Sequence, residues 1–121
     1  MNSDIIRIKN AVFYAYHGVG SEEQSLGGNY EVDLELSGDL AAAKSTDNLK
    51  RTIDYEGVYA VTQSIVTAQK YYLIETLANA IVKGIIHDFP LVQRVTVRVR
   101  KPHPPVKGVI DYVEVEVMEE R

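Results

Sequence analysis

The stretch NYEVDLEL, residues 29–36, decides the fold class, because apolar and acidic side chains alternate strictly from Tyr30 onward. Successive side chains of a strand point to opposite faces of a sheet. This alternation therefore predicts a half-buried β-strand with one apolar and one charged face. The predicted apolar face consists of Tyr30, Val32, Leu34 and Leu36.

Three further segments predict strands on either side of this one. Apolar residues within 5–16 indicate a first strand, and RVTVRVR (94–100) and DYVEVEVM (111–118) repeat the alternation near the other end of the chain. In RVTVRVR the valines oppose arginines, and in DYVEVEVM the valines oppose glutamates. The sequence therefore predicts two strands before residue 40 and two after residue 93.

Two helices are predicted between these strand pairs. The first starts at Tyr55, and apolar residues spaced four apart carry the second up to Pro90, which cannot continue a helix. The first apolar stripe consists of Val58, Val61 and Ile65, with Tyr72 as a further candidate, and the second of Leu73, Leu77, Ile81 and Ile85.

This order predicts one α+β domain over residues 1–121, in which two helices cover one face of a four-stranded antiparallel sheet. The other face carries arginines and carboxylates, and we expect it to be solvated, with a charged ligand groove as the alternative. A small open sheet has two exposed edges, so edge-to-edge association of subunits is also expected.

Composition excludes several classes of protein. The formal net charge is -4, so no polyanion-binding surface and no nucleic-acid partner are expected. The chain has no cysteine, which excludes disulfides, thiolate zinc sites and a cysteine nucleophile. It has no His-x-His, His-Glu-x-x-His or glycine-rich phosphate motif. No apolar run approaches a membrane span and no signal-peptide pattern is present, so we expect a cytoplasmic protein with no membrane partner.

Two connections between predicted strands break the regular pattern. The segment HGVGSEEQSLGG, residues 17–28, is longer and more acidic than a tight hairpin. It is compatible with a functional loop, or with a mobile loop in which Glu22 and Glu23 are solvated.

The second connection, RKPHPPVKG, residues 100–108, places Lys101 at a strand end beside a stiff turn. A lysine directed in this way suits proton transfer, and an ordinary surface lysine is the alternative. Whether an X-Pro bond here is cis is left open.

Glu75 lies in the apolar stretch YYLIETLANAIV, residues 71–82, near the start of the second helix. The helix dipole would favour a carboxylate there by about 0.3–1 kcal/mol. Its neighbours are apolar, however, and a carboxylate in such surroundings would pair well with a planar ligand that offers two adjacent N–H groups. Both interpretations are open on these grounds.

Four segments together closely resemble the dihydroneopterin aldolase family of folate biosynthesis. They are FYAYHGVGSEEQSLGGNYEVDLEL, TIDYEGV, LIETLANAIV and VRVRKPHPPVKG, and they cover nearly the whole chain in the family's order and spacing. The resemblance implies the ββααββ tunnelling fold. It also implies homo-oligomers, namely rings of four subunits that often pair into octamers, with active sites between neighbours.

The resemblance further implies a pterin substrate and a carbon–carbon lyase reaction. Dihydroneopterin is split into 6-hydroxymethyl-7,8-dihydropterin and glycolaldehyde, with epimerisation as a second activity. Many aldolases use a lysine Schiff base or a zinc ion as the electron sink. Here the C=N bond of the dihydropterin ring takes that role, so neither a metal nor a cofactor is expected.

By the same resemblance, Glu75 binds the 2-amino and N3 hydrogens of the pterin, together with the backbone at Ile74. Lys101 is the catalytic lysine that promotes removal of the side-chain hydroxyl proton. Tyr55, contributed by a neighbouring subunit, contacts the substrate and helps to protonate the enol carbon.

Glu23 is matched to a loop glutamate near the hydroxyl chain of the substrate. EEQSLGG departs from the family's more usual Glu-x-Glu-x-Gly-Gln loop, so Glu22 stays an alternative for this role. His17 is predicted to be structural, because a histidine in a turn often bonds backbone groups.

Three other functions remain as alternatives. One is an epimerase acting on dihydroneopterin or its triphosphate, and another is a non-catalytic ring that binds pterins or purines. The third, a zinc-dependent pterin synthase of the same fold, is disfavoured by the lack of a His-x-His pair. Ring size and the phosphorylation state of the substrate are not predicted.

Overall fold

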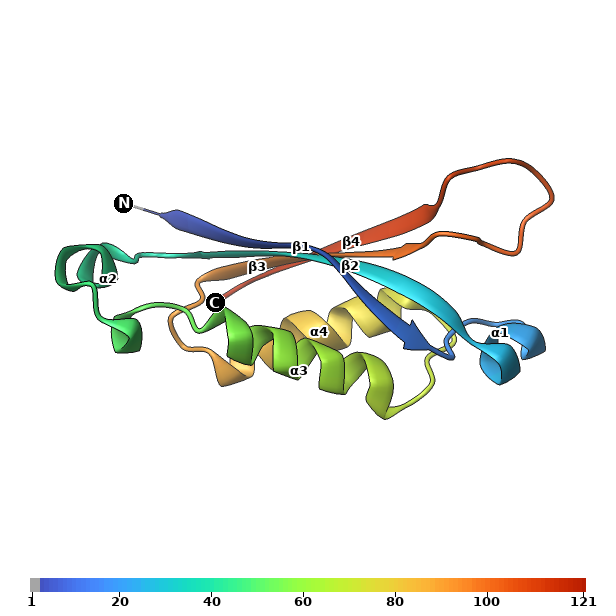
Figure 1. The fold of residues 1–121 in the computed structure, drawn as a ribbon, viewed down its shortest axis with the longest axis horizontal. Helices are drawn as coiled ribbons and strands as arrows, with labels where there is room; N and C mark the ends of the chain where they lie inside the picture. Colours follow the sequence, from blue (N-terminus) through green and yellow to red (C-terminus); the bar gives the residue numbers. More distant parts are fainter. Residues whose placement is uncertain (1–2) are drawn as a thin grey trace.

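A computed structural model describes residues 3–121 as a four-stranded sheet with two long helices on one face (Figure 1). The strands are β1 (Asp4–Ala15), β2 (Gly28–Gly38), β3 (Arg94–Lys101) and β4 (Val113–Glu120). The helices are α1 (Ser21–Leu26), α2 (Ala41–Thr46), α3 (Tyr55–Ala68) and α4 (Ile74–Asp88), with a 3₁₀ turn, η1 (Leu49–Arg51), before α3.

The sheet has the order β1-β2-β3-β4, and every neighbouring pair is antiparallel. α4 packs on β3 and β4, and α3 packs on β1 and α4. The predicted α+β architecture, with both helices on one face, is confirmed. The edges are β1 and β4, so the alternating segment at residues 29–36 lies in an interior strand.

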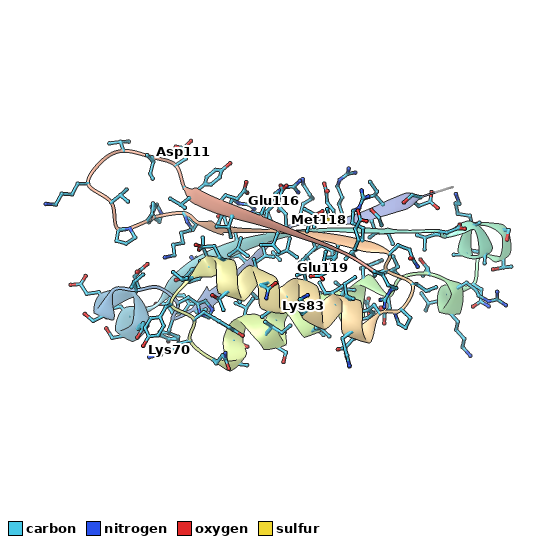
Figure 2. All side chains as sticks on the ribbon, turned by 180° about the vertical axis from the view of Figure 1, so that it is seen from behind. Lys70, Lys83, Asp111, Glu116, Met118 and Glu119 are labelled. Atoms are coloured by element: carbon cyan, nitrogen blue, oxygen red, sulfur yellow. The ribbon has the colours of Figure 1, made fainter. Side chains whose placement is uncertain are left out.

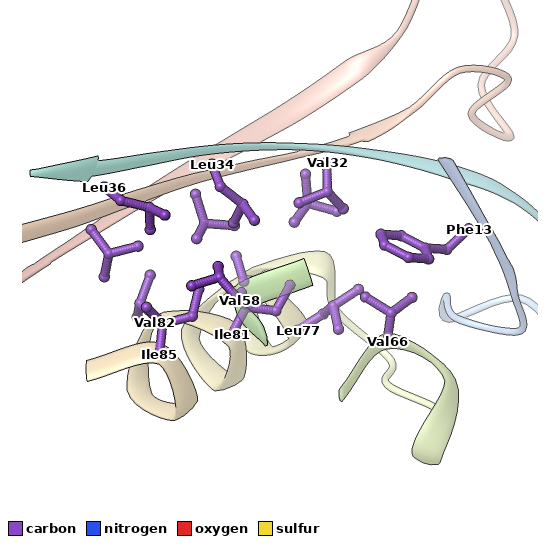
Figure 3. Close-up of a cluster of buried hydrophobic side chains, with 14 of the residues drawn as sticks. Phe13, Val32, Leu34, Leu36, Val58, Val66, Leu77, Ile81, Val82 and Ile85 are labelled. Atoms are coloured by element: carbon purple, nitrogen blue, oxygen red, sulfur yellow. The ribbon is translucent and has the colours of Figure 1, made fainter. Parts of the chain in front are cut away.

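The core lies between the apolar face of the sheet and the two helices (Figure 3). The alternation predicted the buried side of β2 correctly, since Val32, Leu34 and Leu36 are fully buried and Tyr30 is 4% exposed. Leu77 and Ile81 of α4 meet them from the helix side. Burial of each such side chain contributes about 1.5–3 kcal/mol.

The helices end where local signals predict, with one exception. Asp54 caps α3 by accepting a hydrogen bond from the Gly57 N–H at 3.2 Å, and α4 stops at Asp88, two residues before Pro90. The inclusion of Tyr72 in the first helix is wrong, because α3 ends at Ala68 and Tyr72 lies in the connection to α4. Tyr72 lies beyond the end of the helix, so its spacing from the earlier apolar residues does not place it on the apolar face of α3.

Two expectations about the connections also change. The 17–28 connection carries a short helix, α1, and β4 begins at Val113 rather than at residue 111. The described chain contains no cis peptide bond, so the prolines after Lys101 follow trans bonds.

Strand β1 contains a bulge. The β1–β2 register shifts between Ile8 and Ala11, and Asn10 adopts a left-handed conformation in this bulge.

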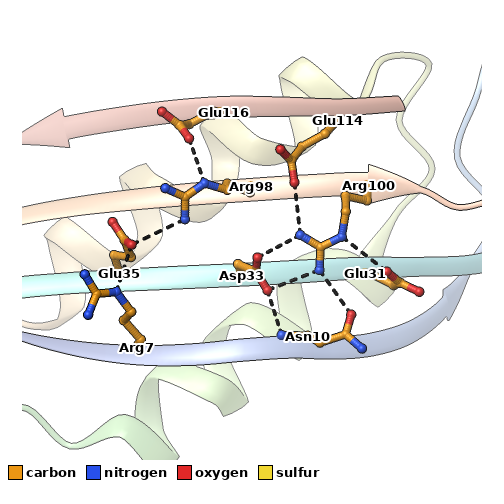
Figure 4. A network of polar contacts seen from close by, with 9 residues as sticks. All are labelled: Arg7, Asn10, Glu31, Asp33, Glu35, Arg98, Arg100, Glu114 and Glu116. Atoms are coloured by element: carbon orange, nitrogen blue, oxygen red, sulfur yellow. Dashed lines mark hydrogen bonds and ion pairs between the residues drawn. The ribbon is translucent and has the colours of Figure 1, made fainter. Parts of the chain in front are cut away.

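The outer face of the sheet is charged, as predicted, but part of it is buried (Figure 4). Arg100 is only 8% exposed and bonds both oxygens of Asp33, at 2.7 and 3.1 Å, as well as Glu31 and Glu114. The expectation of a solvated face is therefore wrong around Arg100, because three carboxylates enclose its guanidinium group.

On the helix side, Lys83 of α4 points toward Glu119 of β4 and forms an ion pair of 2.8 Å with it (Figure 2). This contact ties the end of the edge strand to the helix layer. None of the helices in residues 3–121 combines the length and apolar character needed to cross a membrane.

Candidate functional site

Three connections meet at one end of the molecule: the β1–β2 connection with α1, the α3–α4 connection, and the β3–β4 connection (Figure 1). Lys101 is the last residue of β3, directly before the third connection, and its side chain contacts the first connection. Its Nζ is 3.1 Å from Oε2 of Glu23 in α1, and the two side chains are 16% and 19% exposed. The β3 ladder still includes Lys101, which pairs with Val113, so the start of its side chain is held by the sheet.

The backbone around α1 holds the Glu23 carboxylate in place. The Gly20 N–H donates to Glu23 Oε1 at 3.2 Å. Gly18 has φ +127°, and a Cβ at this position would lie 2.3 Å from the same oxygen. The backbone conformation at residue 18 favours glycine, and a side chain there would also displace the Glu23 carboxylate. The structure brings Glu23 to Lys101, whereas Glu22 is exposed.

Glu75 and Ile74 form the first turn of α4 and line a pocket of about 300 Å³ together with Lys101. Ile74 is 4% exposed, whereas Glu75 is exposed. Within residues 3–121 the Glu75 carboxylate has neither an ion-pair partner nor a side-chain hydrogen bond. The rest of the pocket wall is largely apolar and consists of Val19, Tyr72, Leu73, Pro104, Pro105, Val106, Val113 and Val115.

A second pocket, of about 410 Å³, also includes Lys101 and adds Glu23 to its wall. Tyr14, Asn29 and Tyr30 also line it. Lys101 thus lines two hollows, of which one is largely apolar and contains Glu75 and the other is more polar and contains Glu23. A flat ligand with a polar tail would find suitable surroundings for both of its parts.

Tyr55 lies elsewhere in this chain. It is the first residue of α3, and in Figure 1 this end of the helix is the one farther from α1. Tyr55 is 57% exposed and lines a different pocket with Ile6, Lys50 and Glu56. Of the predicted site residues, the fold therefore brings together Glu23, Ile74, Glu75 and Lys101, and it does not bring Tyr55 to them.

Two buried groups next to the pair have shifted pKa values. Burial lowers the pKa of His17, and the positive charge of Lys101 lowers it further, against a partial rise caused by the Val66 carbonyl. Burial raises the pKa of Tyr30 to about 12, with a further contribution from the charge of Glu23. Both rings stay neutral near pH 7 under these influences.

Neither Gly18 nor Tyr30 was predicted to be part of this region. Tyr30 looked like one more apolar residue of an alternating strand, and its hydroxyl bond to the His17 carbonyl could not be foreseen. For Gly18 there was a signal, since a glycine just after a strand often adopts a conformation that other residues avoid. The prediction that His17 is structural agrees with its hydrogen bonds to backbone groups.

No group of three or more His, Cys, Asp or Glu side chains in residues 3–121 is placed to hold a metal ion. The groups that line the two pockets include the Lys101 amine, the carboxylates of Glu23 and Glu75, and the backbone at the start of α4. Together they can bind a ligand with N–H donors and transfer protons next to it.

Comparison with known proteins matches residues 6–118 to the family model described as FolB: Dihydroneopterin aldolase. The dihydroneopterin aldolase of Bacillus subtilis is 40% identical over 114 residues, which are 94% of this chain and 95% of that protein. That of Streptococcus pyogenes serotype M18 is 39% identical over 118 residues, 98% and 99% of the two chains. A crystal structure of the E. coli dihydroneopterin aldolase in complex with neopterin shares the fold, with a TM-score of 0.87 and 21% identity over 96% of this chain and 98% of that one.

Proposed function

The chain belongs to the dihydroneopterin aldolase family and shares its carbon–carbon lyase activity, and we propose that it performs this cleavage by acid/base chemistry at Lys101. The substrate is 7,8-dihydroneopterin, and the products are 6-hydroxymethyl-7,8-dihydropterin and glycolaldehyde. The observation that supports this assignment of the site is the 3.1 Å pair between Lys101 and Glu23, beside a pocket that also contains Glu75.

Cleavage begins with removal of the proton from a hydroxyl group of the substrate side chain, which Lys101 promotes. The oxygen then forms the aldehyde carbonyl of glycolaldehyde as the carbon–carbon bond breaks. The electron pair of that bond moves into the C=N bond of the dihydropterin ring, and an enol-like intermediate results. Protonation of its side-chain carbon gives the hydroxymethyl product.

Glu75 and the backbone at Ile74 orient the ring for this reaction. A carboxylate that accepts from two adjacent N–H groups, such as the pterin's 2-amino group and N3, makes two charge-assisted hydrogen bonds in a fixed geometry. The carboxylate of Glu75 is exposed at the pocket and has no ion-pair partner among residues 3–121, so it is available for such a ligand.

Glu23 is assigned to the polar tail of the substrate, because it lies next to Lys101 on the side of the more polar pocket. Its contact with Lys101 also restrains a long flexible side chain. A restrained proton-transfer group is more effective because its geometry is set before the substrate binds.

Tyr55 completes the site from a neighbouring subunit, contacting the substrate and helping to protonate the enol carbon. Its exposure and its position at the far end of α3 support this assignment. The proposal therefore includes a homo-oligomer, built as a ring of four subunits or as a pair of such rings, in which each site is shared.

Product analysis tests the reaction. Purified protein is incubated with 7,8-dihydroneopterin and a chelator, and glycolaldehyde and the hydroxymethylpterin are measured. Stoichiometric release of both supports acid/base cleavage, whereas loss of cleavage on chelation, or a borohydride-trapped imine on the protein, contradicts it. Epimerisation at C2′ shares the cleavage step but recombines the fragments, and chromatography of the remaining substrate measures that second activity in the same experiment.

A further inference from the structure

The imidazole of His17 is enclosed just after β1, and hydrogen bonds reach both of its nitrogens. The residue is 1% exposed. Its Nε2 lies 2.8 Å from the Val66 carbonyl oxygen, near the end of α3, and its Nδ1 lies 3.0 Å from the Tyr71 nitrogen. The rings of Tyr30 and Tyr71 pack against it, with centroids 5.1 and 5.3 Å away.

These partners determine which nitrogens of the imidazole carry a proton. The Tyr71 backbone N–H is always a donor, so Nδ1 must accept from it and carries no hydrogen. The proton is then on Nε2, which donates to the Val66 carbonyl. A second proton on Nδ1 would face the Tyr71 N–H directly, so this arrangement requires the neutral ring.

The same two segments of chain are joined again next to the ring. The Gly18 N–H donates to the Tyr71 carbonyl at 2.8 Å. The Tyr30 hydroxyl donates to the carbonyl of His17 itself, which fixes the backbone from the β2 side. The β1–α1 connection and the α3–α4 connection are therefore fastened to each other through His17 and its neighbour.

Each of these connections leads to a proposed site residue within a few positions. Gly18 lies against the Glu23 carboxylate, which in turn contacts Lys101. Tyr71 is three residues before Ile74, where α4 begins, and Glu75 follows. A shift between the two connections would thus move the Glu23–Lys101 pair relative to Glu75.

We propose that His17 is a positioning residue for the aldolase reaction: its neutral imidazole sets the Glu23–Lys101 pair at a fixed place relative to the pterin held by Glu75. His17 itself does not touch the substrate. The inference rests on the proposed function, since it concerns where the proton-transfer groups lie relative to the bound ring. A misplacement of about 1 Å can lower a rate about a hundredfold without abolishing binding.

The test compares His17→Phe, which keeps a ring but loses both hydrogen bonds, with His17→Gln, whose amide can still accept from Tyr71 and donate to Val66. His87→Gln, an exposed histidine near the end of α4, serves as the control. All measurements are made at a temperature where thermal melts show every variant folded, and after gel filtration shows the same assembly state.

For His17→Phe we expect kcat to fall about ten- to a hundredfold, while the dissociation constant of a bound pterin product changes less than about threefold. His17→Gln recovers part of kcat, and His87→Gln matches the wild type. An unchanged kcat in folded His17→Phe overturns the proposal, and so does a Gln variant no more active than the Phe variant, because a purely packing role would give that result.

Hydrogen exchange supplies a readout that does not depend on activity. The Gly18 amide, which bonds the Tyr71 carbonyl, exchanges faster in His17→Phe if His17 fastens the two connections, and unchanged exchange overturns the inference. If His17→Phe does not fold, kcat and the Gly18 exchange rate are measured in His17→Gln instead. If the wild-type protein releases no glycolaldehyde, the proposed function fails, and the exchange rates still decide whether His17 joins the connections.

Discussion

The Lys101 ammonium group lies 3.1 Å from the Glu23 carboxylate, although the two residues are 78 positions apart in the chain. One comes from the end of an interior strand and the other from a six-residue helix in the first connection. The pair is mostly shielded from solvent, with side chains 16% and 19% exposed. It places a lysine and a carboxylate, both able to transfer protons, between two pockets.

Lys101→Ala should lower kcat by about a hundredfold or more, because proton transfer by a positioned side chain contributes about 10²–10⁴-fold. Pterin binding should survive, since Glu75 and the start of α4 are untouched. Steady-state turnover and fluorescence titration measure the two effects separately. Lys107→Ala, an exposed lysine of the same connection, is the control. Turnover near the wild-type level would contradict the assigned mechanism.

Glu75→Ala should weaken pterin binding by roughly 2–4 kcal/mol, because two charge-assisted hydrogen bonds are lost and the ligand's donors stay unpaired. This corresponds to a rise in the dissociation constant of about 30- to 700-fold. Fluorescence titration with a pterin measures it. Glu22→Ala removes the same charge from an exposed position and should bind normally. An equal affinity in the Glu75 variant would refute its role.

Tyr55→Phe and Lys101→Ala subunits should each be inactive alone and regain activity when they are dissociated, mixed and reassembled. In mixed rings some sites would combine an intact Tyr55 with an intact Lys101, because in the proposed site these two residues come from neighbouring subunits. Turnover is assayed after native mass spectrometry verifies mixed assemblies. If verified mixtures show no recovery, the site is not shared between subunits.

Arg100→Met should destabilise the protein by about 2–4 kcal/mol, because it leaves Asp33 and two further carboxylates without their common partner. Urea unfolding at a fixed protein concentration measures this loss. Arg94→Met is the matched control on the same strand, since its pair with Glu120 is more than half exposed and contributes less than about 1 kcal/mol. Equal midpoints for the two variants would mean that burial of the Arg100 cluster has no energetic effect.

Low pH should remove part of the stability that the Arg100 cluster provides. The Arg100 guanidinium, through its hydrogen bonds, holds the pKa of Asp33 below its usual range. The stability from this carboxylate is present above the pKa it has in the unfolded chain, and it is lost as the pH falls through the lower folded value. In Arg100→Met this part of the acid dependence should be smaller.

His17 should make stability depend on pH in a milder range. In the unfolded chain it takes up a proton near its ordinary pKa of 6.5, whereas the folded pKa is lower because of burial and the nearby charge of Lys101. Below pH 6.5 the unfolded state therefore binds more protons, and stability falls with the pH at no more than about 1.4 kcal/mol per unit. Urea midpoints between pH 7.5 and 5.5 measure this slope. His17→Gln should flatten it, while His103→Gln, on the exposed β3–β4 connection, should not.

Local patterns predicted the elements of the fold well, and the reason is that burial on a sheet or helix repeats with the geometry of the element. The valines of β3 and three of the four predicted stripe residues, Leu77, Ile81 and Ile85, are buried as their spacing indicated. The fourth, Leu73, was predicted wrongly, because it precedes α4 and is 47% exposed. The same patterns failed beyond the elements. Tyr72 kept the apolar character of a helix stripe but lies in a connection, and α1 formed in a segment too short and polar for its period to be recognised.

The sequence by itself determined the two-strand, two-helix, two-strand order, the buried faces of the two interior strands, and, through four family-like segments, which side chains are candidates for the chemistry. Only the tertiary structure decided that Glu23 rather than Glu22 meets Lys101, that Tyr55 lines a different pocket of the same chain, and that His17 joins two connections. Periodicity reports the environment of a residue along its own element. Contacts between distant segments depend instead on strand register, the bulge at Asn10 and the backbone conformation of Gly18, which arise only when the whole chain packs.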